Sequence, residues 1–264
     1  MLGQRILVAV VGIPLFVWLA WLGDLPFLLL IILVVGIASY ELERLTAHLG
    51  RLFSPPWQVL LAPSLTLGVR FDPTTTIAVA GAAGFVGLAR AEYLAGRRTT
   101  TPAAALVRFA AFLATALYPT LAGCLLPIRA LPGGFGLVMA TVGAVWANDT
   151  AAYLVGRTWG RHQLVPGLSP GKSAEGLVAG SVAALVFWLA ATIWTGLGSA
   201  EALLMGAVCA LTAPAGDLLE SMLKRAAGAK DSGNVLPGHG GILDRFDSLL
   251  LVAPASWLLL LVLI

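Results

Sequence analysis

Acidic residues near the C-terminus are spaced so that two helices would each present them on one face. The first of these faces is a polar stripe with helical spacing, formed by Asp217, Glu220, Ser221 and Lys224. Asp244 and Asp247 lie three residues apart where the next apolar segment begins, and they also share a face. Carboxylates that converge from two helices suit a hard cation such as Mg²⁺, which takes oxygen ligands and leaves room for substrate phosphates.

The segment between the two faces concentrates charge and glycine. It reads KDSGNVLPGHGGILDRFD (residues 230–247), in a chain that is 59% hydrophobic and 11% charged. Its glycines let the backbone turn tightly and approach a ligand. We expect His239 to form a hydrogen bond within this loop, with a direct metal-ligand role as the alternative. A charged loop that only faces water is the competing interpretation of the whole segment.

Two polar segments upstream are further candidates. Asp149 follows Asn148 inside an apolar segment, where a carboxylate must pair with another group or bind a cation. The segment SPGKSAEG (169–176) ends in a Gly-Lys-Ser triplet, but Pro166 stands where a P-loop requires glycine, and we predict no strand before it. We therefore exclude a P-loop. Lys172 and Ser173 at a helix N-terminus favour phosphate binding, and ordinary capping of that helix is the alternative.

The elements that must position these groups are membrane helices. The mean hydropathy is +0.92 and the charged fraction is 11%, far from the composition of a soluble domain. We predict an all-α polytopic membrane protein that folds as a single domain over residues 1–264. Its nine predicted spans are 5–22, 26–41, 57–69, 74–93, 102–126, 134–156, 174–195, 201–222 and 247–264. Cys124 and Cys209 both lie in apolar segments, so we expect no disulfide framework.

The basic residues predict the orientation of the chain. With a cytoplasmic N-terminus, thirteen of them fall on the cytoplasmic side: Arg5, Arg44, Arg51, Arg90, Arg97, Arg98, Arg157, Arg161, Lys172, Lys224, Arg225, Lys230 and Arg245. Arg70 and Arg129 fall outside, and Arg108 lies near the start of the fifth span. This asymmetry follows the positive-inside rule, and omitting the third span would destroy it. The net charge of +3 therefore indicates topology and lipid contacts, with no nucleic acid as a partner.

Together these segments resemble the signature of the phosphatidate cytidylyltransferase (CDP-diacylglycerol synthase) family. The resemblance is carried by SMLKR (221–225), KDSG (230–233) and LPGHGGILDRFD (236–247), and is supported by DTAAY (149–153) and SPGKSAEG (169–176). It is specific over about residues 145–250, within the helices of 134–264, whereas helices 1–130 resemble the family only in architecture. One departure is Ala151, where many members carry glycine.

The resemblance implies transfer of the cytidylyl group of CTP to phosphatidate at the cytoplasmic face of the inner membrane, with Mg²⁺ as cofactor and CDP-diacylglycerol and pyrophosphate as products. By resemblance, the catalytic residues are Asp217, Asp244, Lys230, Asp231 and Arg245. The implied metal ligands are Asp217, Asp244, Asp247 and Asp231. The implied substrate-binding residues are Asp149, Ser169, Lys172, Ser173, Glu175, Ser221, Lys224, Arg225, His239, Gly240 and Gly241. A second cation and a homodimer are left open.

Two other functions are compatible with parts of this pattern, and a third is excluded. A CTP-dependent prenol or lipid kinase would share the polar region but release CDP in place of pyrophosphate. An ion-coupled transporter would also place Asp149 and Asp217 in helices, but it has no need of a long glycine-rich loop. A CDP-alcohol phosphatidyltransferase is excluded, because its Asp-Gly-x-x-Ala-Arg signature is absent from the sequence.

Overall fold

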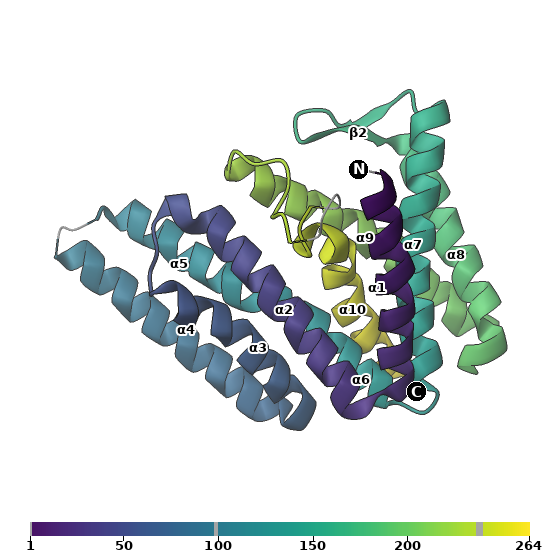
Figure 1. Ribbon diagram of the computed structural model, residues 1–264, viewed down its shortest axis with the longest axis horizontal. Coiled ribbons are helices and arrows are strands. Elements are labelled where there is room, and N and C mark those ends of the chain that lie inside the picture. The colour runs from purple at the N-terminus through teal and green to yellow at the C-terminus, as the bar shows by residue number, and fades with distance from the viewer. Residues whose placement is uncertain (1, 98–99, 236–239) are drawn as a thin grey trace.

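The computed structural model describes residues 2–97, 100–235 and 240–264, and these residues are almost entirely helical (Figure 1). The helices are α1 (Leu2–Leu22), α2 (Asp24–Thr46), α3 (Pro55–Phe71), α4 (Pro73–Gly96), α5 (Pro102–Leu117), α6 (Leu125–Ala130), α7 (Gly134–Trp159), α8 (Ala174–Thr195), α9 (Ser199–Ala226) and α10 (Leu243–Leu263). Two 3₁₀ helices, η1 (Ala47–Leu49) and η2 (Pro119–Cys124), follow α2 and α5. The strands β1 (Gln163–Val165) and β2 (Ser169–Ser173) form an antiparallel hairpin.

The all-α membrane class is confirmed, with this hairpin as its one addition among the described residues. Six helical segments there are long and apolar enough to cross a membrane: α2, α4, α5 with its continuation to Ala130, α8, α9 and α10. Each of the other three predicted spans also coincides with a helix, but α3 is only 17 residues long and α7 carries Asn148, Asp149 and Arg157. The count of nine spans and the cytoplasmic N-terminus therefore stay predictions.

The fifth span differs from the single helix that the sequence predicts over 102–126. The α-helix ends at Leu117, and Pro119 opens the 3₁₀ turn η2. Proline has no N–H, so it cannot donate to the carbonyl of Thr115 four residues before it. That buried carbonyl instead accepts a hydrogen bond of 3.0 Å from the hydroxyl of Ser39 on α2. The break in the helix thus creates a tie between α5 and α2.

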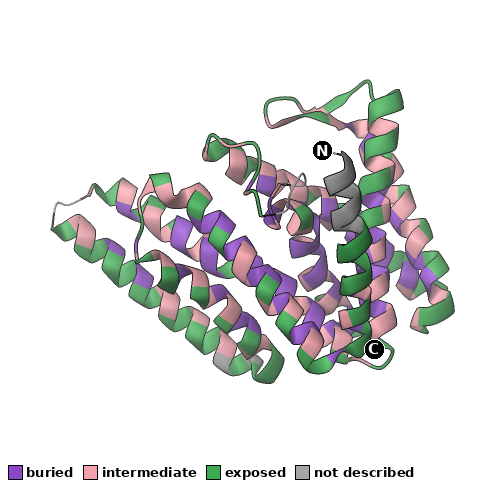
Figure 2. Cartoon of the chain, viewed as in Figure 1, coloured by how far each residue is buried: buried purple, intermediate pink, exposed green. Residues whose placement is uncertain are grey.

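The helices form two groups on either side of α2 (Figure 1). α3, α4 and α5 pack together around a small apolar cluster that includes Leu52, Ala105 and Phe112. On the other side, α7, α8, α9 and α10 pack in sequence, and their core includes Trp188, Met205 and Leu250. Figure 2 shows the contrast in burial: α2 is largely buried, whereas α4 is exposed along most of its length. In a membrane, the exposed apolar side chains of α4 would face lipid.

Glycines bring the helices of the second group close together where the polar residues lie. A Cβ atom on Gly180 of α8 would lie 2.8 Å from the carbonyl oxygen of Asn148 on α7. A Cβ atom on Gly216 of α9 would lie 2.6 Å from the carbonyl oxygen of Asp247 on α10. A larger residue at either position would force the backbones apart, as is typical of small residues between membrane helices. The spacing of α9 and α10 at Asp247 therefore depends on Gly216.

Candidate active site

A three-carboxylate cluster forms where α9 meets α10. Asp217 and Glu220 come from one face of α9, as the stripe predicts, and Asp247 comes from the first turns of α10. One oxygen of each carboxylate lies within 4.8 Å of an oxygen of the other two. Glu220 is fully buried, and Asp217 is partly exposed. Three carboxylates this close repel one another, so the arrangement favours a bound cation or a neighbouring positive side chain.

Lys224 supplies positive charge at the inner edge of this cluster. Its Nζ lies 2.8 Å from Oδ1 of Asp244 and also forms an ion pair with Glu220, one helical turn earlier on α9. The Lys224 side chain is only 15% exposed. The family resemblance implies that Lys224 contacts substrate. In the structure, Lys224 lies between the carboxylates of Glu220 and Asp244. It therefore neutralises part of the charge that α9 and α10 bring together.

Asp244 organises the loop that precedes α10. Its Oδ2 accepts hydrogen bonds from the N–H of Ser232 (2.9 Å), the hydroxyl of Ser232 (2.9 Å) and the N–H of Gly241 (2.8 Å). Together with Lys224, these donors occupy both carboxylate oxygens. The metal ligands expected by resemblance are Asp217, Asp244, Asp247 and Asp231. Of these, Asp217 and Asp247 lie together, with Glu220 as the third carboxylate of the cluster.

The β-hairpin adds a second positively charged side chain to the site. Nζ of Lys172, on β2, lies 2.6 Å from Oδ2 of Asp217. The prediction that no strand precedes this segment is wrong, because β1 lies just before it; strands of three and five residues are too short to show an alternating pattern. Ser173 accepts a 3.1 Å hydrogen bond from the N–H of Gly176 and thus caps α8. The structure therefore gives Ser173 the capping role and directs Lys172 toward the carboxylates.

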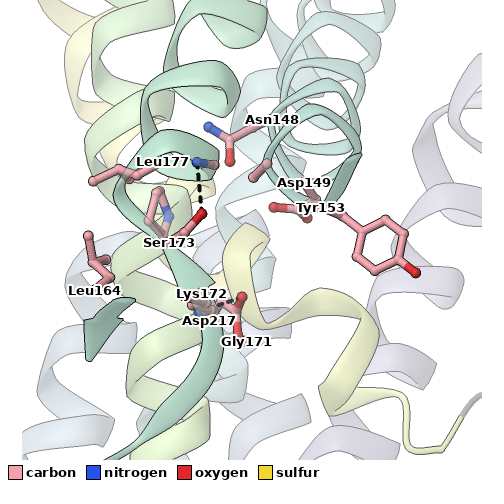
Figure 3. Close-up of a pocket in the computed structure, with 12 residues that line it drawn as sticks. Asn148, Asp149, Tyr153, Leu164, Gly171, Lys172, Ser173, Leu177 and Asp217 are labelled. Atoms are coloured by element: carbon pink, nitrogen blue, oxygen red, sulfur yellow. Dashed lines mark hydrogen bonds and ion pairs between the residues drawn. The ribbon is translucent and has the colours of Figure 1, made fainter. Parts of the chain in front are cut away.

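A polar cavity of about 230 Å³ lies beside this ion pair (Figure 3). Its lining includes Asn148 and Asp149 of α7, Lys172 and Ser173 of the hairpin, and Asp217 of α9. The three polar segments singled out in the sequence thus meet at one place. The side chain of Asn148 is buried, and its Nδ2 has no hydrogen-bond partner among the described residues. A buried amide without a partner is costly, which suits a site that receives a polar ligand.

Other expected residues hold the loops around the cavity. Glu175 accepts hydrogen bonds from the backbone N–H groups of Arg161 (3.1 Å) and His162 (3.3 Å), and its Oε1 lies 2.6 Å from Nδ1 of His162. It therefore fixes the base of the hairpin. Arg225 donates to the carbonyl of Leu168 at the hairpin tip (3.4 Å) and so connects it to the end of α9.

The remaining expected residues lie at the edges of the site. Lys230 and Asp231 are exposed in the turn after α9, while Ser169 and Ser221 are half-buried on β2 and α9. Gly240 has a positive φ of 84°, and a Cβ atom there would lie 2.9 Å from Oδ2 of Asp244. His239 lies outside the described residues.

Arg245 belongs to a second, apolar cavity of about 380 Å³ between α1, α2, α7 and α10. Phe16, Val34, Trp146 and Phe246 are among the residues that line it. Arg245 is the only charged residue in the described lining. Both cavities are lined by α7, which gives Val145 to the apolar cavity and Asp149, one turn later on the same face, to the polar cavity.

Two further residues, Glu41 and Ser232, belong to this region and are not among those predicted from the sequence. Glu41, in the second predicted span, is buried and accepts hydrogen bonds from the loop before α10, and Ser232 connects it to Asp244. A carboxylate inside an apolar span is itself a signal of function, and it could have identified Glu41. Nothing in the sequence alone indicates that Ser232 would face both carboxylates.

With this geometry in place, comparison with known proteins defines the class. Residues 3–263 match the model of the cytidylyltransferase family. The chain therefore belongs to this family and is a nucleotidyltransferase.

Named relatives agree with this assignment. The chain is 33% identical over 271 residues to the phosphatidate cytidylyltransferase of Bacillus subtilis (strain 168), an alignment that covers 97% of both chains. It is 35% identical over 263 residues to that of Brucella suis biovar 1 (strain 1330), covering 97% of this chain and 92% of the relative. A shorter match, 42% identical over 131 residues, covers 49% of this chain and 44% of the uncharacterized protein YnbB of Escherichia coli (strain K12).

Proposed function

We propose that the protein transfers the cytidylyl group of CTP to phosphatidate and so forms CDP-diacylglycerol and pyrophosphate. The observation that carries this proposal is the juxtaposition of the two cavities. One is polar and combines Lys172 with carboxylates, as a nucleoside triphosphate requires, and the other is apolar, with Arg245 as the one charged residue of its described lining. A lipid with an anionic headgroup fits the second cavity. The family membership and the names of the full-length relatives support the same reaction.

In the proposed reaction, a phosphate oxygen of phosphatidate attacks the α-phosphorus of CTP. The new oxygen–phosphorus bond forms as the bond to the β-phosphate oxygen breaks, and pyrophosphate leaves with that electron pair. The attacking phosphate is already ionised near neutral pH, so no general base is needed. The main requirement is to hold anions together and to stabilise the charge on the leaving group. In this proposal, Lys172 donates to the phosphates of CTP and Arg245 to the headgroup of phosphatidate.

The carboxylate cluster fits a magnesium ion. Mg²⁺ prefers oxygen ligands and is usually held by one or two carboxylates together with water and substrate phosphates. Asp217, Glu220 and Asp247 supply closely spaced oxygens for this purpose, and the partial exposure of Asp217 leaves access from the cavity. When bound, the ion would neutralise phosphate oxygens and favour departure of the leaving group. Asp244 and Asp231 are the remaining candidate ligands, and the present partners of Asp244 are Lys224, Ser232 and Gly241.

We further propose that the site opens at the cytoplasmic face of the inner membrane, where CTP is available. The excess of basic residues on the side of the hairpin and of the loop before α10 supports this orientation.

The decisive experiment incubates the purified protein with CTP labelled on the α-phosphate, phosphatidate and Mg²⁺. Label in a lipid product together with release of pyrophosphate is the expected result. Label remaining in released CDP would instead indicate a lipid kinase. Ion or solute uptake by sealed vesicles without CTP, and no lipid product, would indicate a transporter.

A further inference from the structure

A buried carboxylate of the N-terminal half lies against the loop that precedes α10. Glu41 is on α2, and its side chain is 2% exposed. Its Oε1 accepts a hydrogen bond from the N–H of Ile242 (3.0 Å), and its Oε2 accepts one from the N–H of Leu243 (2.8 Å). These two N–H groups stand at the start of α10, where a helix leaves its first amides without internal partners. A negative charge is also favourable there because of the helix dipole.

The loop is shaped around this carboxylate. A Cβ atom on Gly233 would lie 2.6 Å from Oε1 of Glu41, and one on Gly241 would lie 2.6 Å from Oε2. Both distances are below van der Waals contact, so neither position accepts a side chain unless Glu41 moves. The glycines of this segment thus leave room for a specific side chain of another helix, in addition to allowing tight turns.

Glu41 also connects to the carboxylate cluster. The hydroxyl of Ser232 lies 3.3 Å from Oε2 of Glu41 and 2.9 Å from Oδ2 of Asp244. Asp244 in turn holds Lys224, which pairs with Glu220. The start of α10, which Glu41 caps, also carries Asp247 one turn further on. Glu41 therefore supports the site by two routes, through Ser232 and through the helix start.

We propose that Glu41 is a positioning residue for cytidylyl transfer. It fixes the loop before α10 so that Asp244, Lys224 and Asp247 stand in their working arrangement, without touching substrate itself. This inference rests on the proposed function for its catalytic readout.

Glu43 provides a matched control. It is also buried on α2, with 2% exposure, but it forms an ion pair with Arg51, away from the catalytic loop. The variants to compare are Glu41→Gln and Glu43→Gln, each made in the full chain. Glutamine keeps the size of the side chain but removes the charge and one acceptor. We expect Glu41→Gln to lower kcat by about tenfold or more, because small misplacements of reacting groups are costly. Glu43→Gln should lower it much less.

A readout independent of turnover separates positioning from general stability. Hydrogen exchange of the amides in residues 240–245 should be faster in Glu41→Gln than in Glu43→Gln, while exchange in α7 and α8 should be the same in both. If Glu41→Gln expresses poorly, Ser232→Ala tests the same route, and it too should lower kcat with little change in the KM for CTP.

The outcomes distinguish two failures. If the wild-type protein makes no CDP-diacylglycerol from CTP and phosphatidate, the proposed function is wrong, whatever Glu41 does. If the wild-type protein is active and Glu41→Gln keeps both its kcat and its exchange rates at 240–245, the positioning role is wrong. An equal fall of kcat in Glu41→Gln and Glu43→Gln, with equal exchange, would likewise overturn it.

Discussion

Lys172 and Asp217 form an ion pair of 2.6 Å that joins the β-hairpin to α9 at the floor of the polar cavity. The two residues are 45 positions apart in the sequence (217 − 172), and neither lies next to an obvious partner. The pair places a lysine ammonium group beside a carboxylate that also belongs to the three-carboxylate cluster. A triphosphate that enters the cavity would meet both charges at once.

Replacing Lys172 tests this arrangement. Lys172→Ala should raise the KM for CTP by about 10- to 100-fold, the loss typical of a charge-assisted hydrogen bond. The KM for phosphatidate should change little. Arg161→Ala, which removes an exposed charge at the base of the same hairpin, is the control. A normal KM for CTP in Lys172→Ala would mean that the lysine only fastens the hairpin to α9.

The metal site can be assigned by comparing Asp247→Asn with Asp244→Asn. If the cation is held by the cluster, Asp247→Asn should lower turnover by at least about a hundredfold and raise the Mg²⁺ concentration needed for half-maximal rate. Asp244→Asn should lower activity by loosening the loop, with the Mg²⁺ midpoint unchanged. The reverse pattern would make Asp244 the ligand in place of Asp247. Unaltered Mg²⁺ titrations in Asp217→Asn and Asp247→Asn would remove the metal site altogether.

Lys224 should matter for stability as well as for activity. Lys224→Met leaves Glu220 and Asp244 buried without their cation, and breaking a buried pair in this way costs about 3–5 kcal/mol. A lower melting temperature in detergent would measure the loss. The double variant Lys224→Met/Glu220→Gln should recover part of it, because one of the unpaired charges is then gone. Arg157→Met removes an exposed arginine and should leave the melting temperature nearly unchanged.

The apolar cavity predicts a separate effect on the lipid substrate. Arg245→Ala should raise the KM for phosphatidate by about tenfold while the KM for CTP stays the same. Val34→Trp, which would fill the cavity from α2, should act in the same direction. Steady-state kinetics in mixed micelles, with the surface concentration of phosphatidate varied, measure both. A change confined to the KM for CTP in Arg245→Ala would place the arginine at the nucleotide instead.

The predicted orientation can be tested by labelling from each side of the membrane. In a chain without Cys124 and Cys209, single cysteines in Thr100→Cys and Ser199→Cys should react with an impermeant reagent from opposite sides. The cysteine at position 100 should be cytoplasmic. Labelling of both from the same side would contradict nine spans with a cytoplasmic N-terminus.

Much of the fold could be predicted from the sequence, because long apolar segments predict membrane helices. Each predicted span coincides with a helix among the described residues, and the largest difference lies at Pro119, which splits the fifth. Hydropathy averaged over a span changes little at a single proline, so it does not predict the end of α5 before Pro119. The β-hairpin was missed for the opposite reason: its five-residue and three-residue strands carry too few residues for an alternating pattern.

The site could be predicted only in part. The stripe on α9 follows from helical spacing, and its residues do lie together. Which of Asp244 and Asp247 would join Asp217 could not be predicted, because both fall on one face of α10. The answer depends on the loop geometry set by Ser232 and Gly241. Its place in an apolar span could have marked Glu41 as a candidate, but its partners could not be predicted, because they lie about 200 positions away in the sequence.

The tie that Pro119 creates has a mechanical consequence. α2 is fastened to α5 by Ser39 and to the start of α10 by Glu41, only two residues further along the same helix. In a membrane, the exposed apolar side chains of α3, α4 and α5 would face lipid, and helices in a bilayer of unsuitable thickness respond by tilting. Because the hydrogen bonds of Ser39 and Glu41 connect α5 and α10 to the same helix, a tilt of this group would also move the first turn of α10. Turnover should therefore vary with the acyl-chain length of the surrounding, non-reacting lipids, which means that the rate depends on the thickness of the membrane.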